Sequence, residues 1–247
     1  MRRSLLSIFC SAACVMGSAA VQAQPIDYER QEGWVAQLDK AQSPVDIVTA
    51  SASNADPREA RGIVLLKSRT RMKAIDNSHA IEVEARGPEA LIRGRHFRME
   101  QFHFHAESEH TIDGQHFPLE GHFFFRAQDG RMAVVAVMYT QGAANPLAGR
   151  ILDALGTDQE LPLLDIDTLL PKSLSYFHYL GSLTTPPLTE NVEWYVLPQP
   201  VTLSAAQLAR FSARYSHNNR AVQPMNKRPL VHAGLPAGLK ETAARAH

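Results

Sequence analysis

From residue 62 onward the sequence is a series of short apolar stretches separated by turn-forming residues. The stretches cover residues 62–67, 79–85, 96–105, 117–126, 132–140 and 192–197. Several of them alternate apolar and polar residues, a pattern typical of strands that bury one face. The sequence therefore predicts a β-rich single domain, α+β by content, over residues 24–247.

Only two segments carry clear helix signals. Asn145 followed by Pro146 predicts an N-cap and a first-turn proline, and Gly156 predicts the end of that helix. Ser204 with Gln207 forms a capping-box pattern that predicts a second helix start. We expect the tail, from about residue 234 to residue 247, to be loosely held.

The first 23 residues have the pattern of a cleaved secretory signal peptide. Arg2 and Arg3 precede an apolar run over residues 5–15, and Val-Gln-Ala at 21–23 is a small-residue cleavage pattern. The mature chain is then expected to begin at Gln24 and to be periplasmic or secreted. The sequence leaves open whether export follows the general or the twin-arginine route.

The composition narrows the classes of partner. The chain carries 25 basic and 25 acidic residues, a balance that gives no argument for a nucleic acid or an anionic membrane as partner. No apolar run after the signal peptide is long enough for a membrane span. Both cysteines, Cys10 and Cys14, lie in the signal peptide, so we expect a mature chain without a disulfide or a cysteine-ligated metal.

A candidate metal site lies in residues 101–122. The run Gln-Phe-His-Phe-His at 101–105 places His103 and His105 on one face of a strand, with Phe102 and Phe104 on the other. The two histidines are separated by two strand rises, about 7 Å, which is close enough to share one ion.

A third histidine follows from turn chemistry. Asp113-Gly114 is a strong two-residue hairpin signal. If the ladder continues unbroken from a pair between Ile112 and Gln115, His105 faces His122. Three histidines with an open fourth position are the arrangement of a catalytic zinc site, so the sequence predicts one Zn²⁺ per chain.

Two acidic residues accompany these histidines. Glu120 points to the same face as His122 and is placed to accept the other ring N–H of that histidine. Glu109 shares the face of the first two histidines and lies beside the expected ion. An alternative is the cupin pattern His-x-His-x₃-Glu, with iron or manganese in a double-sheet barrel, but Phe97 and His116 stand where its glycines belong.

Several motifs occur in a fixed order along the chain, and the pattern that they form covers roughly residues 27 to 232. They are QSPVDI at 42–47, QFHFH at 101–105, SEHT at 108–111, LEGH at 119–122, GSLTTPP at 181–187 and NNRAVQP at 218–224. Together they resemble the α-class carbonic anhydrases. The resemblance implies a central, twisted, mostly antiparallel sheet with a few short peripheral helices. It also implies a carbonate dehydratase, in which zinc-bound hydroxide attacks carbon dioxide to give bicarbonate and a proton.

The resemblance assigns roles to individual residues. The zinc ligands would be His103, His105 and His122. Thr184 would accept the proton of the zinc-bound hydroxide and donate to Glu109. His79 falls at the proton-shuttle position, with Asn77 and Tyr28 ordering the water chain that leads to it.

Two further sets of residues follow from the same resemblance. The residues expected along the substrate pocket are Thr185, Phe124, Val134, Leu183, Val192 and Trp194. The residues expected around the ligands are Gln101, Glu120, His110 and Tyr179, together with Ser43. The bonds Ser43-Pro44 and Pro186-Pro187 match cis prolines of the family.

The chain also departs from the family pattern. Leu188 replaces one cysteine of a disulfide that is common in bacterial members, and the partner cysteine is missing too. Phe124 stands where a smaller valine is common, which predicts a narrower pocket. Glu82 replaces a neutral amide near His79 and is expected to raise the pKa of that histidine.

Two other functions are consistent with part of this pattern. The chain could be a catalytically silent zinc-binding member of the same fold, or a zinc-storage protein. The first would be expected to lose a zinc histidine and the second to contain histidine-rich tracts, and neither feature is found. For an enzyme the expected partner is the small-molecule pair of carbon dioxide and bicarbonate. The oligomeric state is left open, with a homodimer as one option.

Overall fold

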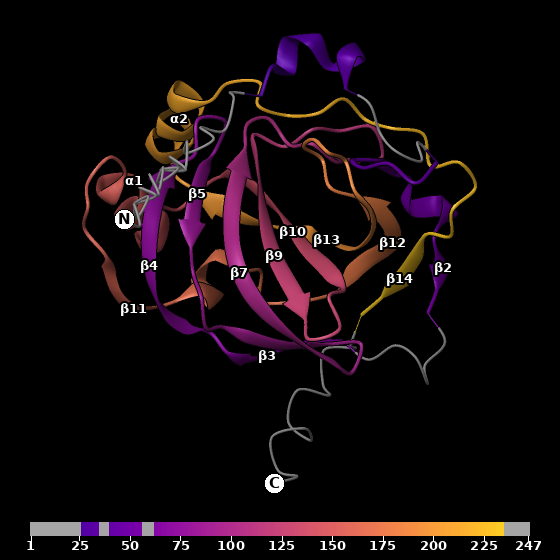
Figure 1. Cartoon of the computed structure of the whole chain (residues 1–247), viewed down its shortest axis with the longest axis horizontal. Helices are drawn as coiled ribbons and strands as arrows, with labels where there is room; N and C mark the ends of the chain where they lie inside the picture. Colours follow the sequence, from indigo (N-terminus) through magenta and orange to yellow (C-terminus); the bar gives the residue numbers. More distant parts are fainter. Residues whose placement is uncertain (1–25, 35–39, 56–61, 235–247) are drawn as a thin grey trace, which may run out of the picture.

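A large twisted sheet occupies the centre of the molecule (Figure 1). The computed structural model describes residues 26–34, 40–55 and 62–234, so the expected signal peptide and nearly all of the expected loose tail lie outside the described residues. In spatial order the strands are β11 (Leu161–Asp165), β4 (Arg69–Asp76), β5 (Ile81–Glu84), β7 (Arg95–His105), β9 (Leu119–Ala127), β10 (Met132–Gln141), β13 (Glu190–Leu203), β12 (Tyr176–Ser182), β14 (Val231–Ala233) and β2 (Ser53–Asn54). Beside this path, β6 (Glu89–Ile92) pairs with β7 and β3 (Ile63–Lys67) pairs with β6.

Most neighbouring strands run antiparallel, as the resemblance implies. The parallel pairs are β10 with β13, β14 with β2, and the separate two-stranded sheet of β1 (Asp46–Ile47) with β8 (Thr111–Ile112). One large mixed sheet is not the double-sheet barrel that the cupin alternative requires. That alternative is therefore wrong.

Both predicted α-helices are present, with the predicted caps. In α1 (Pro146–Ala154) the Asn145 side chain accepts hydrogen bonds from two backbone N–H groups of the first turn. In α2 (Ala205–Arg214) Ser204 and Gln207 form the complete capping box. The two helices lie beside β4 and β5 (Figure 1). Three short 3₁₀ helices complete the described elements: η1 (Tyr28–Gly33), η2 (Thr49–Ser51) and η3 (Ile166–Leu169).

The central sheet separates two apolar clusters. Phe102, Phe104 and Phe123 point to one side and pack with the buried faces of α1 and α2. Phe124 and Trp194 point to the other side. This alternation along β7 and β9 turns the three candidate metal histidines toward the second side.

The predicted register between β7 and β9 is wrong by two residues. His103, rather than His105, faces His122, and His105 faces Glu120. The Asp113-Gly114 turn does form, with Ile112 and Gln115 hydrogen-bonded across it at 3.1 and 3.0 Å. However, β8 pairs with β1 and the connection leaves the β7–β9 ladder. Because the error is an even number, all three histidines still share one face.

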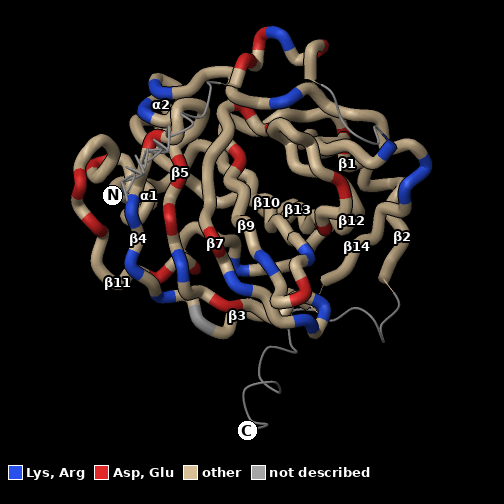
Figure 2. Tube along the Cα trace, viewed as in Figure 1, with Lys and Arg blue, Asp and Glu red and all other residues tan. Residues whose placement is uncertain are grey.

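Charges are mixed over the surface. Figure 2 shows acidic and basic residues interspersed along the trace, in keeping with the balanced composition. Within the described ranges, no helix combines the length and apolarity needed to cross a membrane.

Candidate metal centre

His103, His105 and His122 form a compact cluster on the central sheet. Their ring centroids lie 5.0 Å apart for 103 and 105, 5.3 Å for 103 and 122, and 4.6 Å for 105 and 122. One nitrogen of each ring lies within 4.8 Å of the corresponding nitrogens of the other two. His105 and His122 are buried and His103 is half-buried, so the cluster can surround a single ion with little water around it.

A hydrogen-bond acceptor holds one nitrogen of each ring. The pairs are His103 Nδ1 with Gln101 Oε1 at 2.9 Å, His105 Nδ1 with the Asn218 carbonyl at 2.6 Å, and His122 Nε2 with Glu120 Oε1 at 2.8 Å. These partners accept, so each held nitrogen carries the proton and the other nitrogen offers its lone pair. His105 Nε2 is buried and has no partner among the described residues. The donor set therefore fits a zinc ion held by three imidazoles.

The electrostatics of the cluster differ from ring to ring. Burial lowers the pKa of His103 and of His105, which favours the neutral, metal-binding form. Burial also acts to lower the pKa of His122, but the carboxylates of Glu120 and Glu109 outweigh it and raise that pKa. Glu120 thus increases the basicity of the ring that it orients.

Glu120 begins a buried hydrogen-bond chain beneath the cluster. Its two oxygens accept from His110 Nδ1 at 2.7 Å and from the His110 backbone N–H at 2.8 Å. The chain continues from His110 Nε2 to the Tyr179 hydroxyl at 2.7 Å, and from there to Ser43 Oγ at 2.8 Å. Burial acts to raise the pKa of Glu120, but His110 and His122 outweigh it and hold this pKa well below its usual range. The carboxylate is therefore ionised at neutral pH.

Gly181 makes the close packing around this chain feasible. A Cβ atom at this position would lie 2.1 Å from Ser43 Oγ and 2.8 Å from the Tyr179 ring. Any side chain here would push the serine and the tyrosine apart. The close approach explains why a glycine stands at the first position of the GSLTTPP motif.

Glu109 lies beside the cluster and is fully buried. Its Oε1 accepts the Arg220 backbone N–H at 2.7 Å, whereas Oε2 has no hydrogen-bond partner among the described residues. Oε2 lies 3.8 Å from His122 Nδ1, the nitrogen that would face the ion. Thr184 is buried in the loop after β12, but no hydrogen bond joins its side chain to Glu109 in the described part of the chain.

An apolar wall stands next to the histidines. Val134 pairs across the sheet with Phe124 on one side and Trp194 on the other. These residues and Val192 belong to one buried cluster, against which half-buried Leu183 packs. The Trp194 ring centroid is 4.8 Å from that of His122. Trp194 thus brings this apolar cluster next to the candidate metal site, and Thr185 follows Thr184 in the Thr-Thr-Pro-Pro loop.

His79 lies in the turn between β4 and β5. Its backbone N–H donates to Asn77 Oδ1 at 3.2 Å, and its buried ring Nδ1 has no partner among the described residues. Burial lowers the pKa of His79. The expectation that Glu82 raises this pKa is therefore wrong: the Glu82 carboxylate accepts from Asn77 Nδ2 at 2.9 Å, and burial decides the direction in which the pKa of His79 shifts.

Tyr28 belongs to η1. Its hydroxyl is buried without a partner in the described ranges. Burial, together with the charge of Glu109, raises its pKa. The hydroxyl is therefore a neutral donor close enough to Glu109 to sense that carboxylate.

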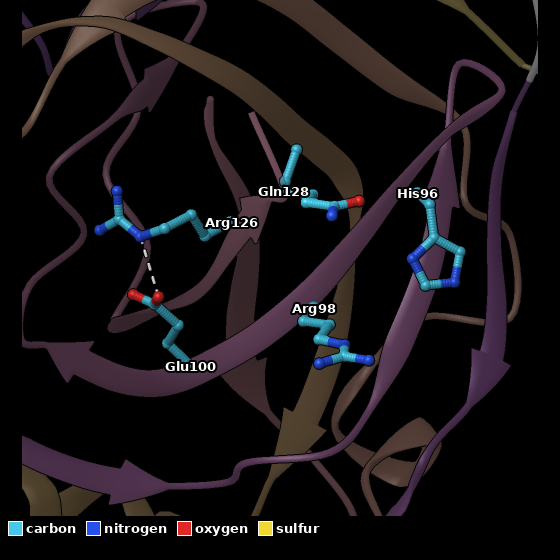
Figure 3. Close-up of a pocket in the computed structure, with 6 residues that line it drawn as sticks. His96, Arg98, Glu100, Arg126 and Gln128 are labelled. Carbon is cyan, nitrogen blue, oxygen red and sulfur yellow. Dashed lines mark hydrogen bonds and ion pairs between the residues drawn. The ribbon is translucent and has the colours of Figure 1, made fainter. Parts of the chain in front are cut away.

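A separate hollow of about 480 Å³ lies over β7 and β9. His96, Arg98, Glu100, Arg126, Ala127 and Gln128 line it. Figure 3 shows the Arg126 guanidinium turned toward Glu100, with which it forms an ion pair of 2.8 Å. Arg98 forms its ion pair with Glu89 instead, at 3.4 Å. None of the three clustered histidines lines this hollow, and its charges are largely paired.

Sequence reasoning did not assign roles to Asn218 and Arg220. The Asn218 carbonyl holds the His105 ring, and the Arg220 backbone holds Glu109. The NNRAVQP motif was the only signal available, because these contacts join segments more than 100 residues apart in the chain.

Comparisons with known proteins agree with this geometry. The family model for eukaryotic-type carbonic anhydrases matches residues 29–233. A carbonic anhydrase of Pectobacterium carotovorum is 42% identical over 203 residues, which cover 78% of this chain and 80% of that protein. A carbonic anhydrase of Nostoc sp. is 35% identical over 205 residues, covering 80% of this chain and 77% of that protein.

Solved structures give the same result. The α-carbonic anhydrase of Thermovibrio ammonificans, in complex with the inhibitor sulfanilamide, has a TM-score of 0.71 and 33% identity, covering 79% of this chain and 88% of that one. Dioscorin complexed with ascorbate shares the fold, with a TM-score of 0.72 at 24% identity over 80% of this chain and 87% of that one. The chain belongs to the eukaryotic-type carbonic anhydrase family. Its relatives and its fold support carbonate dehydratase activity.

Proposed function

We propose that the chain is a zinc-dependent carbonic anhydrase that interconverts carbon dioxide with bicarbonate and a proton. The observation that carries this proposal is the cluster of three imidazoles whose unbonded nitrogens converge beside an apolar wall. His103 and His105 would bind zinc through Nε2, and His122 would bind it through Nδ1. Zinc held by these three imidazoles would lower the pKa of a coordinated water to about 7, as in carbonic anhydrase, and so would supply a nucleophile at neutral pH.

The apolar wall supports carbon dioxide as the substrate. The molecule is linear and has no net dipole, so it gains more from a dry surface than from strong hydrogen-bond donors. Val134, Val192 and Trp194 offer such a surface beside His122. Phe124 would narrow the substrate pocket at this surface, and Thr185 would contribute its polar edge.

Glu109 and Thr184 would control the orientation of the attacking group. Glu109 Oε2 is a buried carboxylate oxygen without a partner among the described residues. If the Thr184 hydroxyl donates to this oxygen, Thr184 Oγ1 can itself only accept a proton. Thr184 would then select a protonated oxygen nucleophile and turn its lone pair toward the substrate.

His79 would carry the product proton to solvent. Its Nδ1 has no partner among the described residues, and its lowered pKa leaves the ring mostly neutral at pH 7, so it can both accept and release a proton. Asn77 and Tyr28 would order the water between this ring and the metal centre. Export to the periplasm or beyond is part of the same proposal, supported by the pattern in residues 1–23.

Metal analysis combined with a stopped-flow hydration assay tests the proposal. We expect one zinc per chain, rapid hydration of carbon dioxide, loss of activity after chelation, and recovery when zinc is added back. Zinc-free protein that hydrates carbon dioxide at the full rate would contradict the proposal. So would zinc-loaded protein that is inactive, which would instead favour a catalytically silent member of the fold.

A further inference from the structure

Asn218 connects the candidate relay histidine to the metal-binding strand. We infer that Asn218, with Asp76 on the opposite side, positions His79 relative to the metal centre and so sets the efficiency of proton transfer. This inference rests on the proposed function.

The Asn218 side chain is buried, 2% exposed, and all its polar atoms are engaged. Its Nδ2 donates to the carbonyls of His79 and Phe104, both at 3.0 Å. Its Oδ1 accepts the Ala106 backbone N–H at 2.9 Å. The partners fix the orientation of the amide, because the opposite orientation would set its oxygen against two carbonyls.

These contacts join the two parts of the site through one residue. Phe104 and Ala106 flank His105, whose ring is held by the Asn218 backbone carbonyl. The same side chain holds the backbone of His79. The spacing between the relay histidine and His105 is therefore fixed by this short, fully bonded amide in addition to the β5–β7 ladder, in which Ile81 pairs with Phe104.

Asp76 anchors the other side of the turn. Its carboxylate accepts from the Ser78 backbone N–H at 3.0 Å and from the side chains of Arg214 and Tyr215 at the C-terminal end of α2. Ser78 has a positive φ of 73°, so the chain reverses sharply just before His79. The turn is thus held by α2 on one side and by Asn218 on the other.

The ring of His79 is held differently from its backbone. Backbone atoms of this residue bond to Asn77 and Asn218, whereas ring Nδ1 has no partner in the described part of the chain. A fixed backbone and a ring nitrogen without a protein hydrogen bond suit a group that must exchange protons with water. A shift of the His79 backbone would change the length of the water chain between this ring and the metal centre. A misplacement of about 1 Å can reduce a reaction rate by up to about 100-fold.

A double-mutant cycle tests this role with zinc-loaded protein. We expect Asn218→Ala to lower hydration turnover about tenfold in weak buffer, with recovery when imidazole is added and with zinc content unchanged. In a His79→Ala background the same substitution should have almost no further effect. Asn219→Ala is the matched control, because no side-chain hydrogen bond of Asn219 is found within the described residues, and it should keep full turnover.

A second readout is independent of turnover. In the zinc-free protein, Asn218→Ala should shift the NMR signals of the His79 ring and its titration, whereas Asn219→Ala should leave both unchanged. If Asn218→Ala does not fold, Asp76→Asn, which weakens the second anchor, should give the same loss in weak buffer and the same rescue by imidazole.

Equal losses in the wild-type and His79→Ala backgrounds, or losses that imidazole does not restore, would overturn the inference. Unchanged turnover and unchanged His79 signals would also overturn it. These outcomes differ from failure of the proposed function, because in that case the wild-type protein itself would not hydrate carbon dioxide.

Discussion

The histidines of the metal cluster and the histidine of the β4–β5 turn are held in opposite ways. In the cluster, an acceptor fixes the second nitrogen of each ring, so both the tautomer and the direction of the free lone pair are set. In the turn, the backbone of His79 is fixed and ring Nδ1 has no partner among the described residues. A metal ligand must stay in place, whereas a proton relay must exchange its proton, so the difference in hydrogen bonding fits the role proposed for each group.

Removing one ligand is expected to have the largest effect. His105→Ala leaves two imidazoles for the ion, so zinc should no longer co-purify and turnover should fall by at least about 1,000-fold, since the activated nucleophile is lost. Zinc content by mass spectrometry and stopped-flow hydration measure both effects. A mutant that keeps stoichiometric zinc and full turnover would refute the ligand assignment.

The next largest effect is expected from a change at Glu120, which orients the ring of His122. Glu120 accepts hydrogen bonds from His122 Nε2, His110 Nδ1 and the His110 backbone, and Glu120→Gln would turn an amide NH₂ toward one of these donors. We expect zinc affinity to fall by about 10- to 100-fold, measured by competition with a chelator. Glu100→Gln, on the exposed part of β7, is the control and should keep wild-type affinity. Unchanged affinity in the Glu120 variant would remove its role in orienting His122.

A smaller effect is expected from a change at His79, the proposed relay. His79→Ala should lower turnover about tenfold in weak buffer and retain zinc, because a proton-transfer group is lost while the ligands stay intact. Added imidazole should restore the rate. If turnover is independent of buffer in both proteins, His79 is not the relay.

The smallest effect is expected in the pH dependence of stability. Burial lowers the pKa of His79 in the folded state, so the unfolded chain binds a proton first as the pH falls. The free energy of unfolding of wild type should therefore drop relative to His79→Gln below a pH of about 6.5 and run parallel to it above that pH. Urea unfolding of the zinc-free proteins across this range measures the difference. Curves that stay parallel throughout would show that His79 is not desolvated.

Local chemistry made much of this structure predictable. The caps of α1 and α2 and the turn at Asp113-Gly114 depend on residues within four positions of one another, and all three form as predicted. The common face of the three histidines follows from the two-residue period of a strand, which survives an even error in register. Glu120 bonds to His122 for the same reason.

Contacts between segments far apart in the chain could not be predicted from the sequence. The pairing of β8 with β1 draws the hairpin away from the β7–β9 ladder, and no local signal indicates it. β12 was not predicted, because most of its residues are buried on both faces and the sequence does not alternate. Asn218 holds the His105 ring through a hydrogen bond between residues 113 positions apart in the chain. The pKa of His79 is lowered by burial, and the presence of Glu82 nearby in the sequence does not indicate that burial.

A crystal structure with anomalous data collected at the zinc edge tests the central claim most directly. We predict one zinc peak at about 2.0–2.1 Å from His103 Nε2, His105 Nε2 and His122 Nδ1, with a fourth ligand that is not a protein side chain. His110, Glu120 and His122 form a second group whose donor atoms also lie within 4.8 Å of one another. A peak at that second group, or a protein side chain in the fourth position, would contradict the account.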